Sequence, residues 1–368
     1  MGVLSLCGKS RWAAAGSSAL LVSTALLLSS LAAVAPANAA VGGNHGKPLP
    51  YRIFAPYFEA WDTSAGGLAS QSQASGAKFL SLAFLQTPQA GSCAADWNGD
   101  PTQPISQATF GSDIATIQAA GGNVIPSFGG YTADTTDTEI ADSCTDVQAI
   151  AHVYESLIST YHVSRIDMDV EANSLTNTAG IDRRNKAVAL TEAWAAERHL
   201  QIQFSYTIPS AATGLTAAGV AVLQNAIANG ARIDTVNAMT FDYYYGTQQD
   251  MLADTETAGA GLFSELQALY PGVSARSLWH MVGVTEMPGI DDFGAEETFT
   301  TADAAPLLQW ADQQGIGFLS FWALQRDNGT CPGTKGAGAC SGVAQSQWFF
   351  SHAFEPFTGF THSANDQF

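Results

Sequence analysis

Short apolar segments alternate along the chain with stretches that have helical periodicity. Eight segments rich in Val, Ile, Phe and Tyr have the length and composition of buried strands. They span residues 52–57, 79–84, 123–128, 165–170, 201–206, 234–240, 281–285 and 317–322. Apolar residues spaced for one helix face follow three of them: Ala187, Leu190 and Trp194; Val220, Leu223 and Ile227; and Leu262, Leu266 and Leu269. Glycines at 121–122, 230 and 315 stand where helices should end.

This alternation predicts the fold class. Parallel strands need crossover connections, and helices supply them. The pattern therefore predicts an α/β protein with a single parallel eight-stranded (β/α)8, or TIM, barrel over residues 51–362. An open doubly wound sheet is the alternative, but no G-x-G-x-x-G stands at an early strand–helix junction. We expect residues 40–50 to be a short disordered segment and residues 363–368 to be a C-terminal tail.

The first 39 residues have the composition of a secretory signal peptide. Lys9 and Arg11 provide the positive start, residues 12–34 are mostly apolar, and Ala37-Asn38-Ala39 is a small-x-small cleavage site. We expect cleavage after Ala39 or Ala40 and export to the extracellular space. An uncleaved membrane anchor is the alternative, because the apolar run is long.

Four cysteines remain after removal of this leader, and an even number in an exported chain predicts two disulfides. Four cysteines allow three pairings. We favour Cys331–Cys340, which encloses a short Gly-rich loop, and therefore Cys93–Cys144. A zinc site is disfavoured because no cysteine pair has ligand spacing.

The charge balance restricts the partners. The chain has 14 basic and 33 acidic residues and a net charge of −19. An acidic surface repels phosphate backbones, so we expect no nucleic-acid partner. No later stretch is long and apolar enough to span a bilayer, so we expect no membrane contact after cleavage of the leader. No feature requires more than a monomer.

The fourth predicted strand carries three carboxylates. Side chains alternate along a strand, so Asp167, Asp169 and Glu171 share one face and the apolar residues between them share the other. The apolar face should meet the helices, which directs the acids into the barrel and towards its C-terminal mouth, where barrel active sites lie. Burial and like charges raise carboxyl pKa values, so one of these acids can donate a proton near neutral pH. The alternatives are an exposed edge strand and a Ca²⁺ or Mg²⁺ site.

This strand resembles the D-G-x-D-x-D-x-E signature of glycoside hydrolase family 18, the chitinase family. Asp167, Asp169 and Glu171 occupy the last three acidic places, whereas Ser164 and Arg165 replace the first Asp and the Gly. Four other segments resemble family motifs in the right order. They are Ser127–Gly130 for S-x-G-G, Met239–Tyr243 for the M-x-Y-D segment, Gly283–Met287 for the G-V-T-x-M of one bacterial branch, and Ser320–Ala323 for the Trp of strand eight. The resemblance covers about residues 52–330.

The resemblance implies a secreted, retaining chitinase that cuts β-1,4 bonds between N-acetylglucosamine units with assistance from the substrate and without a cofactor or metal. Glu171 would protonate the glycosidic oxygen while the acetamido carbonyl oxygen attacks the anomeric carbon. Water activated by Glu171 would then open the oxazolinium intermediate. Asp169 would bind the acetamido N–H, Asp167 would share charge or a proton with Asp169, and Asp242 would position the acetamido group or the water.

Further residues are candidates for sugar contacts. Trp322 would form the apolar floor beneath the reacting sugar, because sugar C–H faces stack on aromatic rings. We assign further contacts to Tyr57, Met239, Tyr206, Glu286 and Gln325.

Phe241 departs from the family pattern. Many members have Tyr there, and its hydroxyl holds the acetamido group. We expect another hydroxyl to replace it, with Tyr243 as the first candidate and Tyr206 as the second.

The chain has no large insertion after its seventh strand, which predicts an open, endo-acting cleft. Two other functions share this fold and motif: an endo-β-N-acetylglucosaminidase that acts on N-glycans, and a catalytically weak chitin-binding protein.

Overall fold

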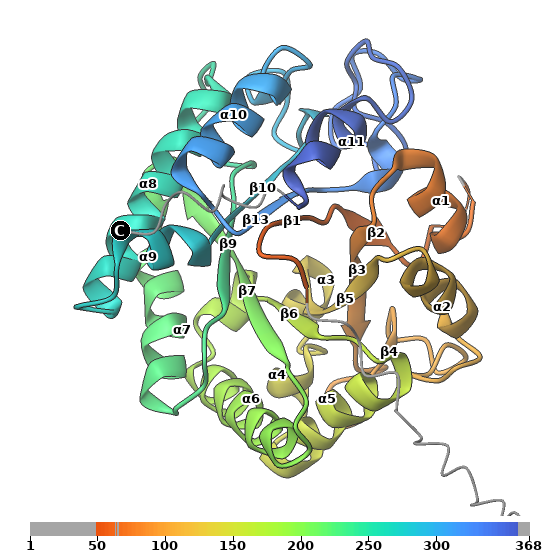
Figure 1. The fold of residues 1–368 in the computed structure, drawn as a ribbon, viewed down its shortest axis with the longest axis vertical. Helices are drawn as coiled ribbons and strands as arrows, with labels where there is room; N and C mark the ends of the chain where they lie inside the picture. Colours follow the sequence, from red (N-terminus) through yellow and green to blue (C-terminus); the bar gives the residue numbers. More distant parts are fainter. Residues whose placement is uncertain (1–48, 63, 65, 360–368) are drawn as a thin grey trace, which may run out of the picture. The chain divides into compact units, whose positions relative to one another are not determined.

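All eight predicted strands are present in the computed structural model, which describes residues 49–62, 64 and 66–359 (Figure 1). They are β1 (Ile53–Phe54) continued by β2 (Tyr57–Glu59), β3 (Phe79–Gln86), β5 (Asn123–Gly129), β6 (Arg165–Asp169), β7 (Gln203–Ala211), β9 (Thr235–Met239), β10 (Val282–Glu286) and β13 (Phe318–Phe321). The described residues all belong to the unit Gly43–Phe368. The predicted leader (1–39), residues 40–48 and the predicted tail lie outside the described residues.

The sheet closes through the first strand. β1 pairs in parallel with β13, and β2 pairs in parallel with β3. Only Ala55 and Pro56 separate β1 from β2, so one segment bridges both ends of the sheet path. The other neighbours among the eight strands are parallel as well. The predicted α/β barrel is confirmed.

Helices cover the outside of the strands (Figure 1). The α-helices are α1 (Leu68–Ser75), α2 (Gly111–Ala119), α3 (Tyr131–Thr135), α4 (Ile140–Ser143), α5 (Val147–Tyr161), α6 (Thr178–Glu197), α7 (Ala217–Ala228), α8 (Met251–Leu269), α9 (Ala275–Met281), α10 (Ala304–Gln314) and α11 (Phe349–Phe354). Single 3-10 turns are η1 (Ala172–Leu175), η2 (Leu324–Arg326) and η3 (Glu355–Phe357). Within the described residues, no helix is long and apolar enough to cross a membrane.

Short antiparallel strands extend the barrel at its loops. β4 (Asp96–Trp97) pairs with β3, and β8 (Gly214–Leu215) pairs with β7. β11 (Gly289–Ile290) and β12 (Thr298–Phe299) form a separate antiparallel pair after β10.

The predicted buried face of α7 is partly wrong. Leu223 is buried, but Val220 is only half-buried and Ile227 is 38% exposed. The core side of the helix instead consists of Val222, Leu223 and Ala226. Nearly every position of α7 is apolar, so periodicity alone does not select one face. The faces predicted for α6 and α8 are buried or half-buried.

Both predicted disulfides are formed. Cys93 and Cys144 join the loop after β3 to the end of α4, with their Cα atoms 4.7 Å apart. Cys331 and Cys340 close the loop after η2, with their Cα atoms 6.0 Å apart. Each cross-link restricts the unfolded chain and so stabilises a loop that lies near the mouth of the barrel.

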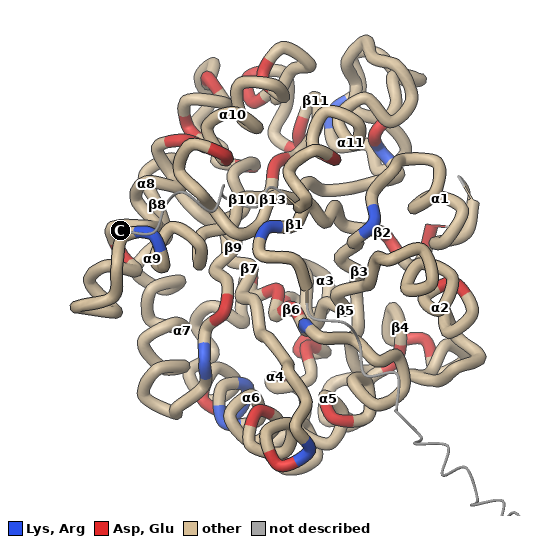
Figure 2. Tube along the Cα trace, viewed as in Figure 1, with Lys and Arg blue, Asp and Glu red and all other residues tan. Residues whose placement is uncertain are grey.

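Charged residues are distributed around the barrel (Figure 2). The basic side chains of α6 have partners close by: Arg184 pairs with Glu139 at 2.8 Å, and Lys186 pairs with Asp182 at 2.6 Å. Arg183 donates to the carbonyl of Ala141 at 2.7 Å. Arg183 and Arg184 are therefore bound to the neighbouring segment 139–142, whereas Lys186 forms an exposed pair within α6 itself.

Candidate active site

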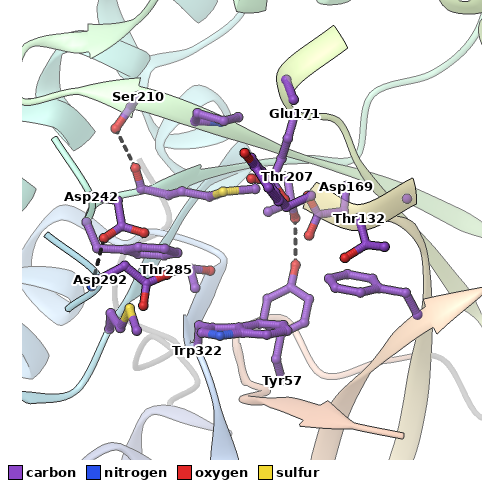
Figure 3. A pocket seen from close by; sticks show the side chains of 18 of the residues that line it. Tyr57, Thr132, Asp169, Glu171, Thr207, Ser210, Asp242, Thr285, Asp292 and Trp322 are labelled. Carbon is purple, nitrogen blue, oxygen red and sulfur yellow. Dashed lines mark hydrogen bonds between the residues drawn. The ribbon is translucent and has the colours of Figure 1, made fainter. Parts of the chain in front are cut away.

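A cleft of about 740 Å³ opens where the parallel strands end. Its lining includes Gly129 at the end of β5, Asp169 at the end of β6 and Met239 at the end of β9. The cleft therefore lies at the C-terminal mouth of the barrel, where the alternation of side chains along the fourth strand predicts the acidic residues. Figure 3 shows Asp169 and Glu171 on one side of the cleft, Asp242 and Asp292 on the other, and Trp322 between them.

Asp167 lies below the cleft and is fully bound by hydroxyl groups. Its carboxylate accepts hydrogen bonds from Tyr57 at 2.9 Å, Ser127 at 2.7 Å, Ser205 at 2.7 Å and Thr207 at 2.8 Å. Burial raises the pKa of Asp167, and these hydrogen bonds oppose the rise. β6 lies between β5 and β7, so the edge-strand alternative is wrong. Four donors occupy the lone pairs of this carboxylate, which leaves none for a metal ion.

Asp169 and Glu171 form a carboxyl pair whose side chains share a hydrogen bond. Asp169 is buried, and Glu171 lies half-buried in the cleft wall. Burial raises the pKa of Glu171 to about 7, opposed by hydrogen bonds from Asp169 and from the Tyr131 backbone. Burial and the charges of Glu171 and Asp167 hold the pKa of Asp169 well above its usual range. Two carboxyls in contact need a proton between them, so the pair keeps an acidic proton at neutral pH.

The opposite wall comes from β9 and the turn that follows it. Met239, Phe241 and Asp242 all line the cleft. Asp242 has a left-handed backbone with φ of 53°. Its N–H donates to Asp291 at 3.0 Å, and its carboxylate accepts from the N–H of Asp292 at 3.0 Å. Burial and the charge of Asp292 raise the pKa of Asp242 to about 6.

An aromatic cluster forms the floor. The ring of Trp322 stacks on Phe84 with centroids 5.5 Å apart, and it contacts Tyr57 at 5.6 Å and Trp61 at 6.1 Å. All four rings line the cleft. The peptide bonds Ala83–Phe84 and Trp322–Ala323 are cis. The arrangement offers a flat apolar surface next to the carboxyl pair, which suits the C–H face of a sugar.

The structure does not bring Tyr206 or Tyr243 into the cleft. The Tyr206 hydroxyl donates to Asn185 on α6 at 2.8 Å, on the outer side of β7. Tyr243 is nearly buried and stacks on Tyr245 with centroids 5.5 Å apart. Strand parity turns Tyr206 outward, since Ser205 and its alternate neighbour contact Asp167. Neither tyrosine is in place to replace the hydroxyl expected at Phe241.

Glu286 and Gln325 also lie outside the cleft lining. Glu286 is fully buried on the outer side of β10, where Thr240 and Thr255 donate to it. The amide of Gln325 donates to the carbonyls of Glu59 at 2.9 Å and Asp62 at 3.1 Å. Both side chains support strand ends and loops, and neither lines the cleft as the predicted sugar contacts would require.

Several lining or supporting residues were not predicted. Phe84, Tyr131, Thr207, Ser210, Tyr244 and Asp292 line the cleft. Ser127 and Thr207 follow the same inward parity as Asp167 in the paired strands, where Ser127 is opposite Asp167 and Thr207 is opposite Asp169. The alternation of side chains, combined with the register between neighbouring strands, therefore predicts that these two hydroxyls point inward beside Asp167.

Replacing Tyr243 tests its exclusion from the chemistry. We expect Tyr243→Phe to keep kcat and KM within about twofold of the parent, because no cleft contact is lost. The matched variant Tyr57→Phe removes a hydroxyl from buried Asp167, and we expect it to lower kcat about tenfold, the cost of one such hydrogen bond. A large loss of kcat in folded Tyr243→Phe would show that the Tyr243 hydroxyl takes part in the reaction.

Known proteins resemble this chain over most of its length. A family model described as glycosyl hydrolases family 18 matches residues 53–277. The chain is 30% identical over 330 residues to a probable bifunctional chitinase/lysozyme of Escherichia coli, across 86% of this chain and 36% of that protein. It is 30% identical over 296 residues to Endochitinase 11 of Metarhizium anisopliae, across 77% of this chain and 54% of that protein. The chain thus spans about a third to a half of the length of these two curated relatives.

A solved structure gives the same fold. The catalytic domain of a hyperthermophilic chitinase from Pyrococcus furiosus superposes with a TM-score of 0.73 at 28% identity. The match covers 87% of this chain and 100% of that domain. A structure of catalytic-site mutants of active domain 2 of a chitinase from the same organism matches with a TM-score of 0.74, also at 28% identity, over 87% of this chain and 100% of that one.

Proposed function

Because the chain belongs to glycosyl hydrolases family 18, we propose that it hydrolyses β-1,4 bonds between N-acetylglucosamine units of chitin, with retention at the anomeric carbon. The two curated relatives described above are named as a probable bifunctional chitinase/lysozyme and an endochitinase, which supports this substrate. The observation that carries the proposal is the hydrogen-bonded pair Asp169–Glu171 beside the Trp322 floor. It combines a proton donor with a sugar-sized apolar surface.

Glu171 starts the reaction as the general acid. Its proton passes to the glycosidic oxygen as the bond to the anomeric carbon breaks and the aglycone leaves as an alcohol. The acetamido carbonyl oxygen of the same sugar forms the new bond to that carbon, which gives an oxazolinium ion. The Glu171 carboxylate then takes a proton from water. The water oxygen opens the ring, which restores the acetamido group and Glu171 in its acid form.

The other carboxyls position the nucleophile. With substrate bound, the proton that the pair shares lies on Glu171, so Asp169 is a carboxylate that accepts the acetamido N–H and whose negative charge balances the oxazolinium ion. Asp167 and its hydroxyl donors fix the strand beneath it. Asp242 faces them across the cleft and contacts the acetamido group or the water. Holding an intramolecular nucleophile in line supplies a large part of the rate, because it removes the entropy cost of a bimolecular encounter.

The pH dependence of kcat/KM follows from the protonation of Glu171. A general acid must be protonated, and burial raises the pKa of Glu171 to about 7. We therefore expect kcat/KM to fall as pH rises through about 7, because the acid form disappears. Initial rates on a chitin tetramer between pH 4 and 9 measure this limb. A decline already complete at pH 5 would show that Glu171 titrates like an exposed glutamate and would contradict the assignment.

Product analysis separates the candidate functions. We expect chitin hexamer to give dimers, trimers and tetramers from the first minutes, as an endo-acting enzyme with an open cleft produces, and a high-mannose glycoprotein to remain intact. Release of the glycan instead identifies an endo-β-N-acetylglucosaminidase. Binding of the hexamer without any turnover identifies a chitin-binding protein of the same fold.

We further propose that the protein is exported and acts outside the cell as a monomer. The proposal rests on the leader composition, with Lys9 and Arg11 before the apolar run and the cleavage site at 37–39. N-terminal sequencing of exported protein should start at Ala40 or Val41; a start at Met1 would contradict it.

A further inference from the structure

A buried carboxyl next to the catalytic strand has no part in the mechanism above. Asp134 belongs to α3, the short helix after β5, and its side chain is fully buried. Its Oδ2 accepts a hydrogen bond from the backbone N–H of Glu171. Glu171 lies between the end of β6 and the start of η1, where no strand partner takes this N–H. Asp134 therefore holds the backbone of the proposed proton donor.

A second buried carboxyl and one arginine lie behind Asp134. Arg184 of α6 pairs with Glu139 at 2.8 Å, and both side chains are 1% exposed. Glu139 also accepts the N–H groups of Ala141 at 2.8 Å and Asp142 at 3.1 Å, which caps α4. Within the part of the chain that the structure describes, Arg184 makes its ion pair with Glu139 alone, while its charge also acts on the buried Asp134 and on the half-buried Asp142. Asp134 and Glu139 are thus two buried carboxyls with one buried guanidinium between them. A surplus buried charge is costly, so one of the two carboxyls should be neutral.

The contacts decide which carboxyl is neutral. Glu139 has the ion pair and two backbone donors, whereas Asp134 has the single Glu171 donor. The groups that face Asp134 are Glu139, Arg184, Glu171 and Asp169. Burial, followed by the charge of Glu139, raises the pKa of Asp134 to about 8, and Arg184 opposes the rise. Among the described residues, neither Asp134 Oδ1 nor Asp169 Oδ1 has a hydrogen-bond partner.

Gly129 brings these groups close together. It has φ of 104°, and a Cβ at this position would overlap the carbonyl oxygen of Asp169 and lie 3.4 Å from Asp134 Oδ1. Gly129 therefore lies between the Asp134 side chain and the backbone of Asp169, and its missing side chain lets the two approach each other. A charge on Asp134 would act directly on the Asp169–Glu171 pair.

On the premise that the chain is the glycosidase described above, we propose that Asp134 is a positioning residue for the proton donor. Its neutral carboxyl fixes the backbone of Glu171 without adding a negative charge beside the Asp169–Glu171 pair. The second half of the reaction needs Glu171 as a carboxylate, and a charged neighbour would oppose that form. A neutral acid at Asp134 meets both requirements.

Two variants and a control test the proposal. Asp134→Asn keeps a carbonyl acceptor and no charge, so we expect kcat on a chitin tetramer within about threefold of the parent. Asp134→Ala loses the acceptor, and we expect kcat to fall about 30-fold with KM within about threefold. Asp137→Asn changes an exposed acid of the same loop and should match the parent.

The titration of Glu171 supplies a readout that needs no substrate. In ¹³C NMR of the ligand-free protein, Asp134→Asn should leave the Glu171 midpoint within about half a pH unit, because no charge is removed. A midpoint lowered by more than about one unit would show that Asp134 is charged, and parental kcat in folded Asp134→Ala would show that it does not position Glu171. Either result overturns the proposal. A parent that is inactive on chitin oligomers overturns the proposed function alone, since the titration still tests Asp134.

Discussion

Glu171→Gln should lower kcat on a chitin tetramer by at least about 1,000-fold, within the range that general acid–base catalysis contributes. The amide has the shape of the acid but no proton to give to the glycosidic oxygen. The floor of Trp322, Phe84 and Tyr57 is untouched, so we expect the Kd of the tetramer to change less than about threefold. Single-turnover rates and calorimetric titration measure the two quantities separately.

A buried glutamate outside the cleft provides the matched control. Glu286 lies on the outer side of β10 and is fully buried, and burial holds its pKa well above the usual range. Glu286→Gln replaces a neutral acid with a neutral amide, so kcat should remain within about twofold. Comparable turnover by Glu171→Gln and the parent would remove Glu171 from the chemistry.

Asp169→Asn should lower kcat about 100-fold or more on the same tetramer. The variant loses the negative charge that balances the oxazolinium ion, and an amide can present N–H instead of an acceptor to the acetamido group. The effect should fall mainly on kcat, because the charge is needed in the transition state. Asp137→Asn, an exposed acid-to-amide change, should leave kcat unchanged.

Substrates without the acetamido group test whether Asp169 acts on that group or only stabilises positive charge at the reacting sugar. The parent should not cleave the deacetylated glucosamine oligomer, because it lacks the assisting carbonyl. If Asp169→Asn retained parental kcat on the acetylated tetramer, the proposed contact with the acetamido N–H would be wrong.

Strand parity explains most of what the sequence predicted correctly. A period of two placed Asp167 and Asp169 on the inner face of β6, and the hydroxyls around Asp167 confirm that direction. The same rule applied to β7 directs Ser205 inward and Tyr206 outward. The prediction for Tyr206 considers its hydroxyl and not its parity, whereas in the structure that hydroxyl donates to Asn185 on the outer side of β7.

The alternation of side chains along a strand does not predict side-chain directions in the loops that follow the strands. Asp242 and Tyr244 have left-handed backbones, with φ of 53° and 58°, so the chain reverses direction there and Tyr243 turns away from the cleft. Asp134 meets Glu171 through a hydrogen bond between residues 37 positions apart. The contact depends on the conformation of the loop after β5, and no sequence pattern around Asp134 predicts it.

The configuration of the first product tests the central claim most directly. The parent is mixed with a chitin tetramer, and ¹H NMR follows the new reducing end before mutarotation. Substrate-assisted hydrolysis with Glu171 as the acid and base predicts that the β-anomer appears first and then converts to the α-anomer. Initial formation of the α-anomer would mean direct attack by water, and it would contradict the mechanism proposed for Asp169 and Glu171.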